Sequence, residues 1–156
     1  MLTLTFCLGS SVVFGDCAAE RSSVSEALKK HDAVFSGKVL RVKGPEIITR
    51  DGRSEFASGM IEVTFRVLKT WKSVDTEEVT IVTPHSSCGY GFVVGEEYLV
   101  WASLDRSSPA RLMVSLCSRT DKLARAAKDL RKLGKGHLIG KWNDWYSLPL
   151  LRLCPK

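Results

Sequence analysis

The clearest pattern along the chain is an alternation of apolar and polar residues between positions 61 and 67. Its apolar positions are Ile61, Val63, Phe65 and Val67, and Glu62, Thr64 and Arg66 stand between them. Successive side chains of a strand point to opposite faces, so this segment predicts a strand with one buried and one exposed face. Four other segments are rich in β-branched and apolar residues and predict strands as well: 33–43, 78–83, 98–103 and 112–116.

The expected fold is mainly β, a five-stranded OB-like barrel with flanking helices. Gly37 interrupts the first predicted strand and indicates the bulge or sharp bend that closed barrels use. Five short strands with such a glycine favour a small barrel over a sandwich. Residues 44–59 are polar and rich in turn formers, with Asp51-Gly52 as the strongest turn signal. The flanking strands are therefore expected to continue into a long hairpin.

Two helices are expected on either side of the strands. Ser23 and Glu26 have the spacing of a capping box, which predicts a short helix with His31 capping its far end. Residues 121–133 place leucines and alanines on one side and charged residues on the other, which predicts a C-terminal helix. Thr120 is its expected N-cap, and Gly134 its expected stop signal.

Charge is distributed unevenly along the 156 residues. Residues 1–119 hold 14 basic and 14 acidic residues, whereas residues 120–156 hold 9 basic and 3 acidic ones, which accounts for the whole net charge of +6. This argues for a basic C-terminal region and against a nucleic-acid binder that is basic all over. The residues expected on this basic surface are Lys122, Arg125, Lys132, Lys135 and Lys141.

The sequence indicates a secreted protein of three parts. Residues 1–15 are apolar or small and resemble a signal peptide cleaved before Asp16, with a buried first strand as the alternative. Residues 16–133 form the expected domain, and residues 134–156 a basic, Trp-containing extension. No apolar run reaches the about 20 residues of a transmembrane segment. We expect a monomer.

Five cysteines bear on the compartment: Cys7, Cys17, Cys88, Cys117 and Cys154. Loss of the leader removes Cys7 and leaves an even number, which is typical of a secreted domain with two disulfides in one of three connectivities. The alternative is reduced thiols in a cytosolic chain. His85-x-x-Cys88 has a metal-like spacing but supplies only two ligands, so we expect no metal and no cofactor. Ser, His and Cys at 85–88 fit a polar disulfide loop better than a nucleophile, so we expect no enzyme activity.

Several motifs in order resemble the netrin-like fold, and more narrowly the tissue inhibitors of metalloproteinases (TIMPs). They are DAVFSGKV, CGYGFVVGEEYLVWA and LCSRT, followed by an Ala/Leu-rich helix. The matching segments are residues 25–39, 65–71, 88–102 and 115–133, and the resemblance covers about residues 16–133. It implies an OB-like five-stranded barrel and a secreted inhibitor whose partner is a zinc metalloproteinase.

The resemblance also implies disulfides. The family opens with Cys-x-Cys, whose first cysteine pairs with the CG loop and whose second pairs with the cysteine before the RT motif. Carried over, the second bridge joins Cys17 to Cys117, while Gly15 stands in place of the first cysteine. Cys88 and Cys154 then remain as a second pair, or as two free thiols.

In the family the first cysteine is the mature N-terminus, and its amine and carbonyl chelate the protease's zinc. The positions carried over as protease contacts are Asp16, Cys17, His85, Ser86, Ser87 and Cys88. Because the chelating cysteine is replaced, we expect an inhibitor or a non-inhibitory relative. One alternative is a netrin-like extracellular module that binds acidic polysaccharide or a membrane surface through the basic C-terminal region. A third reading is an intracellular OB-fold that binds single-stranded nucleic acid.

Overall fold

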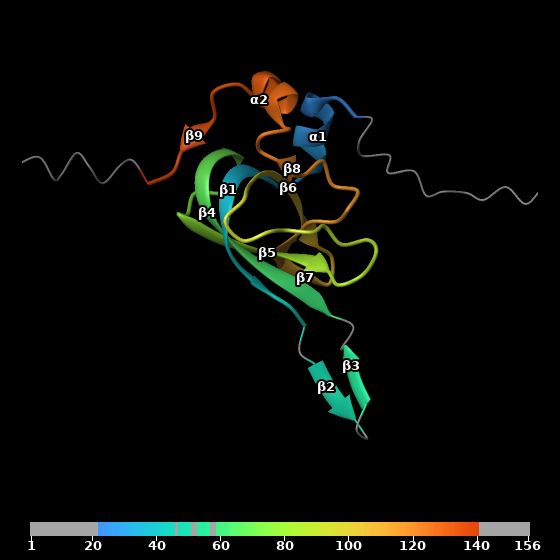
Figure 1. Cartoon of the computed structure of the whole chain (residues 1–156). Coiled ribbons are helices and arrows are strands. Elements are labelled where there is room, and N and C mark those ends of the chain that lie inside the picture. Colours follow the sequence, from blue (N-terminus) through green and yellow to red (C-terminus); the bar gives the residue numbers. More distant parts are fainter. Residues whose placement is uncertain (1–21, 46, 51–52, 57–58, 141–156) are drawn as a thin grey trace, which may run out of the picture.

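The computed structural model describes residues 22–45, 47–50, 53–56 and 59–140 (Figure 1). The helices are α1 (Val24–Lys30) and α2 (Ala127–Leu133). The strands are β1 (Ala33–Lys43), β2 (Ile47–Arg50), β3 (Arg53–Phe56), β4 (Met60–Lys72), β5 (Glu78–Pro84), β6 (Glu97–Asp105), β7 (Ser108–Met113), β8 (Asp121–Lys122) and β9 (His137–Leu138).

Five strands close into a ring, which confirms a mainly β, barrel-like fold with flanking helices. The neighbours run in the order β1, β4, β5, β7 and β6, and β6 pairs again with β1. The β5–β7 pair is parallel and the other pairs of the ring are antiparallel. β7 begins earlier than the predicted fifth strand, at Ser108. The pairing of β1 with β6, in addition to β4, closes the ring.

Gly37 lies where β1 bends, as predicted. The β1–β4 register shifts between Ser36 and Gly37, which marks an irregularity of the β-bulge kind. A Cβ atom at position 37 would stand 2.9 Å from the carbonyl oxygen of Arg66 and 3.2 Å from the Cβ of Phe65. Only glycine allows the two strands to approach this closely.

The barrel interior is built around aromatic rings. Phe65 is fully buried and makes edge-to-face contacts with Phe35 and Phe92, at centroid distances of 5.6 Å and 5.3 Å. Tyr98 is also buried, and its hydroxyl accepts a hydrogen bond from the backbone N–H of Val93 at 3.1 Å. The polar end of the tyrosine is thereby satisfied inside an apolar core.

One strand-face prediction is corrected. Thr64, expected on the exposed face of β4, is buried, and a hydrogen bond of 3.1 Å to Thr80 Oγ1 satisfies its hydroxyl there. Trp71 is half-buried, and its Nε1 donates to the carbonyl oxygen of Gly134 at 3.1 Å. Trp101 is fully buried beneath the two helices.

Helix α1 begins and ends as predicted. The hydroxyl of Ser23 accepts from the N–H of Glu26, and the Glu26 carboxylate accepts from the N–H of Ser23 at 2.8 Å. At the other end, His31 Nδ1 lies 2.9 Å from the carbonyl oxygen of Ala27. The His31 ring also packs edge-on against Trp101. The caps at Ser23 and His31 fix the two ends of α1, and the contact of His31 with Trp101 connects the helix to the barrel.

The predicted helix over 121–133 is wrong in its first half. Asp121 and Lys122 form β8, which pairs with Leu99 and Tyr98 on β6. Thr120 is not an N-cap: it is buried, and its Oγ1 accepts from the N–H of Trp101 at 2.9 Å. The backbone of β6 needs hydrogen-bond partners here, and this need overrides the local helical pattern.

The hairpin predicted over 44–59 is present. β2 and β3 pair with each other, from Ile47 opposite Phe56 to Arg50 opposite Arg53. They project from the barrel at the end opposite the helices (Figure 1). Residues 51–52, which carry the turn signal, lie outside the described residues.

The beginning of the predicted extension joins the barrel. β9 pairs with β4, with His137 opposite Thr70 and Leu138 opposite Lys69. Residues 141–156, with the tryptophans of the extension, lie outside the described residues. In the described part of the chain, no helix is long and apolar enough to cross a membrane.

Asp105 is buried at the end of β6, and we expect the hydrogen bonds of its carboxylate to be sensitive to acid. Its carboxylate accepts from the hydroxyl and N–H of Ser107 at 2.7 and 2.9 Å, and from Arg111 Nε at 3.1 Å. The Ser107 hydroxyl, followed by Arg111, lowers the pKa of Asp105 to about 2.

Because this pKa is lowered in the folded state, the stability it contributes is present above the unfolded pKa of about 4 and is lost as the pH falls towards 2. We expect Asp105→Asn to remove this part of the stability loss in urea titrations between pH 5 and about 2. Asp75→Asn, at an exposed position, is the control. An unchanged acid profile for Asp105→Asn would contradict the assignment.

Candidate functional site

The loop after β5 and the segment after β7 lie side by side. The N–H of Leu116 donates to the carbonyl oxygen of Cys88 at 2.7 Å, and Gly89 forms a β-bridge with Ser115. A Cβ atom at Gly89 would stand 1.9 Å from the carbonyl oxygen of Pro84, so only glycine permits this tight return. The structure therefore joins the CG motif to the LCSRT motif, although Leu116 comes 28 residues after Cys88 in the chain.

The predicted contact residues of this loop share one exposed surface. His85, Ser86, Ser87 and Cys88 are all exposed. Backbone hydrogen bonds hold this loop in place. The N–H of His85 donates to the carbonyl oxygen of Gly59 at 3.0 Å, and the N–H of Gly89 donates to the carbonyl oxygen of Ser86 at 2.9 Å. The other two predicted contacts, Asp16 and Cys17, lie outside the described residues.

The two described cysteines differ in state. Cys117 is disulfide-bonded, whereas Cys88 is an exposed free cysteine. The partner of Cys117 therefore lies outside the described residues, and its assignment to Cys17 stays a prediction. The proposed bridge from Cys88 to Cys154 is not formed in the structure. Leu116, the first residue of the LCSRT motif, is 54% exposed and offers an apolar contact next to Cys117.

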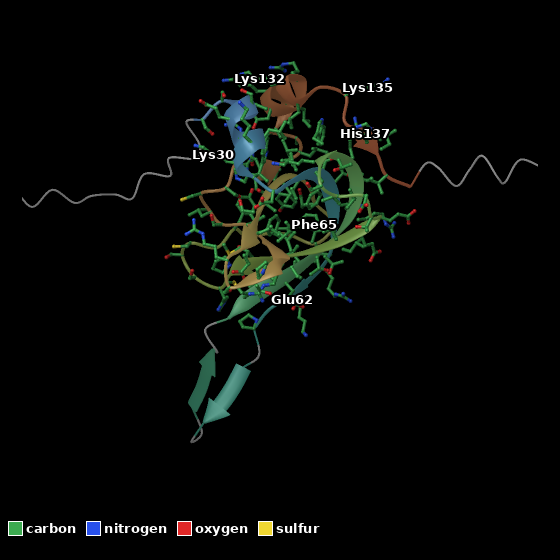
Figure 2. All side chains as sticks on the ribbon, turned by 180° about the vertical axis from the view of Figure 1, so that it is seen from behind. Lys30, Glu62, Phe65, Lys132, Lys135 and His137 are labelled. Atoms are coloured by element: carbon green, nitrogen blue, oxygen red, sulfur yellow. The ribbon has the colours of Figure 1, made fainter. Side chains whose placement is uncertain are left out.

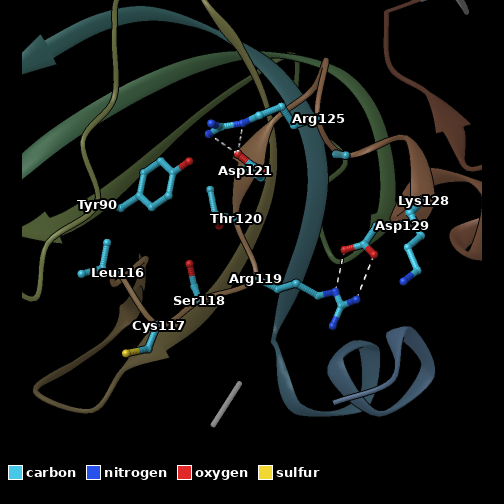
Figure 3. Close-up of a pocket in the computed structure, with 11 residues that line it drawn as sticks. Tyr90, Leu116, Cys117, Ser118, Arg119, Thr120, Asp121, Arg125, Lys128 and Asp129 are labelled. Carbon is cyan, nitrogen blue, oxygen red and sulfur yellow. Dashed lines mark hydrogen bonds and ion pairs between the residues drawn. The ribbon is translucent and has the colours of Figure 1, made fainter. Parts of the chain in front are cut away.

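A cavity of about 610 Å³ opens beside Cys117 (Figure 3). Arg119 forms one wall: its guanidinium pairs with the carboxylate of Asp129, and its Nη1 donates to the carbonyl oxygen of Ser22 at 2.6 Å. The other residues of the wall are Tyr90, Leu116, Ser118, Thr120, Asp121, Arg125, Ala126 and Lys128. Arg119 thus ties the first described residue of the chain to the edge of this cavity.

Charges within the cavity are largely balanced. Asp121 pairs with Arg125, as Asp129 does with Arg119 (Figure 3). Burial, followed by the negative charge of Asp121, raises the pKa of Tyr90. The Tyr90 hydroxyl therefore remains a neutral donor and acceptor at physiological pH. Among the described residues, no three His, Cys, Asp or Glu side chains gather into a metal site.

The predicted basic surface is divided. Lys122 pairs with Glu96 at 3.2 Å, and Arg125 pairs with Asp121, so both charges are offset locally. Lys132 and Lys135 are exposed on and after α2. Lys141 lies outside the described residues.

Sequence reasoning overlooked Arg119, Tyr90 and Leu116. Arg119 could have been identified from the sequence, because it is the arginine of the LCSRT motif. Tyr90 and Leu116 gave no local signal, since their shared cavity forms only when distant segments meet.

Comparison with known proteins adds no assignment. No protein-family model matches the chain, and no curated protein matches it in sequence.

Proposed function

We propose that the protein is a secreted, TIMP-like netrin domain with an OB-like barrel, which binds a zinc metalloproteinase at the edge formed by residues 85–88 and 115–118. The observation that carries the proposal is the contact between the CG loop and the LCSRT segment, with Cys88 bonded through its backbone to Leu116. The resemblance requires these two motifs to lie against the same N-terminal segment. The closed ring of five strands, bulged at Gly37, supports the OB-like assignment.

The path of the chain supports the same edge. The carbonyl of Ser22 is held by Arg119, two residues from the disulfide-bonded Cys117. Ser22 is five positions after Cys17, and an extended chain of five residues reaches about 17 Å. Cys17 is thus close enough in the chain to be the partner of Cys117, which would bring Asp16 towards the exposed loop.

Two chemical features of Asp16 act in opposite directions. A free α-amine at Asp16 could bind the protease's zinc, and the carboxylate is itself a competent oxygen ligand. The same carboxylate would be placed at a specificity pocket that is usually apolar, where an unpaired charge costs several kcal/mol. A loss of about 4 kcal/mol turns a nanomolar complex into a micromolar one. We therefore propose binding with weak inhibition.

This predicts the outcome of titrating the mature protein against matrix-type metalloproteinases. For proteases with deep apolar pockets we expect inhibition constants of about 1 µM or weaker. Asp16→Val should tighten inhibition by about 100-fold, because it removes the buried charge. Acetylation of the α-amine of this variant should abolish the gain, since an amide nitrogen is a poor zinc ligand.

Matched variants locate the contact surface. Leu116→Glu should weaken binding about tenfold or more, whereas Leu104→Glu should not, although both leucines are exposed. Leu104 lies on β6, outside the proposed edge. Nanomolar inhibition by the unaltered protein would overturn the role given to Asp16. Failure of every protease on the panel to bind, with or without the valine, would overturn the proposed function.

A further inference from the structure

The cavity of about 610 Å³ has a wall that the protein holds in place without a ligand (Figure 3). The N–H of Tyr90 donates to Thr83 Oγ1 at 2.7 Å, and the Tyr90 ring packs on the Phe92 ring at a centroid distance of 4.8 Å. The N–H of Ser118 donates to the carbonyl oxygen of Ser115 at 3.0 Å. A cavity of this volume with polar groups in fixed positions is typical of binding sites for small molecules.

Two polar atoms of this wall are left without a hydrogen-bond partner among the described residues. The hydroxyl oxygen of Ser118 is buried and bonds to no other group there. The Asp121 carboxylate accepts from Arg125 and from the N–H of Lys122 at Oδ1 alone, which leaves Oδ2 open. The Tyr90 hydroxyl points towards Asp121 (Figure 3). Because buried polar groups almost always have a partner, this wall is complete only when another molecule supplies one.

The charges of the cavity wall favour a ligand without net charge. The wall holds three cations and two carboxylates, which disfavours a cationic ligand. An anionic ligand would need a cation that no carboxylate already holds, but both arginines of the wall are paired. The remaining cation, Lys128, is exposed on α2 rather than enclosed. A neutral ligand leaves both ion pairs intact.

The neutral ligand must also be rich in hydrogen-bonding groups, because an apolar one would leave the buried Ser118 hydroxyl unpaired. We propose that the cavity binds one ring of a neutral monosaccharide, a hexose. Each sugar hydroxyl can donate and accept, so adjacent hydroxyls suit both Ser118, which does either, and Asp121 Oδ2, which only accepts. Leu116 and the Tyr90 ring, in the same wall, give the C–H groups of the sugar an apolar surface.

The cavity is separate from the exposed lysines at the helix end of the molecule. Lys30, Lys132 and Lys135 lie at that end (Figure 2), and none of them lines the cavity. Attraction of an acidic ligand to these lysines would therefore not depend on Ser118 or Tyr90. A loss of binding on removal of those two hydroxyls identifies the cavity as the site.

The test is a titration of the purified, isotope-labelled full chain with glucose, galactose and mannose, followed by NMR. We expect at least one of these hexoses to shift the amide signals of residues 118–125 in a saturable way. Ser118→Ala and Tyr90→Phe should each weaken that binding about fivefold, the effect of one hydrogen bond. Ser103→Ala, at a half-buried serine of β6 outside the cavity, should bind as the unaltered protein does. Thermal unfolding of Ser118→Ala should match that of the unaltered protein, because the missing hydroxyl has no partner in the described residues.

Several results would overturn the proposal. If none of the three hexoses gave a saturable shift, ordered water would be the only partner left for the Ser118 hydroxyl. Tighter binding of glucuronate than of glucose would assign the cavity to an anion. Hexose binding that Ser118→Ala and Tyr90→Phe leave unchanged, or that Ser103→Ala weakens equally, would place the ligand elsewhere. No protease takes part in the titration, so its failure and the failure of the proposed function are separate results.

Discussion

Replacing Cys117 by serine is expected to lower the free energy of unfolding by about 3 to 5 kcal/mol. If the partner is Cys17, the bridge closes a loop of about 100 residues, and such a bridge stabilises mainly by restricting the unfolded chain. Cys117 itself is exposed, so loss of packing contributes little. Urea unfolding of the purified protein measures the difference.

Cys88→Ser is the matched control, because Cys88 is also exposed but is a free cysteine. Its effect should stay within about 0.5 kcal/mol. Peptide mapping without reduction should recover Cys17 joined to Cys117. Recovery of Cys17 joined to Cys88 would show that the N-terminal segment has been aligned wrongly, and a large effect of Cys88→Ser would agree with that result.

Phe65→Ala is expected to cost about 3 to 5 kcal/mol, the usual range for a buried phenylalanine. Phe65 is 0% exposed, and its ring contacts Phe35, Phe92 and Tyr98 edge-on. Its Cβ also faces Gly37, where the strands come closest and cannot relax to fill a cavity. Chemical denaturation of the purified variant measures this cost.

Val94→Ala provides the comparison, since Val94 is 57% exposed in the loop before β6. A change within about 0.5 kcal/mol is expected there. If Phe65→Ala cost less than about 1 kcal/mol, the aromatic cluster could not be the centre of the barrel. The closed ring of strands would then be in question.

Local patterns proved reliable where a residue's neighbours in sequence are also its neighbours in space. The capping box of Ser23 and Glu26 and the hairpin of β2 and β3 belong to this group. Each depends on contacts within a few residues, and such contacts survive whatever the rest of the chain does. The bend at Gly37 could be predicted for a related reason, because a glycine inside a strand indicates that another backbone segment lies close to it.

Features that depend on distant partners were decided by the tertiary structure alone. Thr120 reads as a helix cap in sequence, but the unpaired backbone of Trp101 makes it a strand partner. Lys122 is predicted from the sequence to be part of a basic face, but the carboxylate of Glu96, 26 residues earlier in the chain, offsets its charge. The contact between Cys88 and Leu116 likewise has no local signature.

The sequence by itself thus determined the strands, the first helix, the bend of β1 and the motifs that resemble the TIMP family. The tertiary structure decided which motifs share an edge and which cations remain unpaired. The physical reason is that periodicity reports whether a side chain is buried, whereas hydrogen bonds and ion pairs depend on which group stands opposite. Closure of the ring brings the CG loop beside the LCSRT segment.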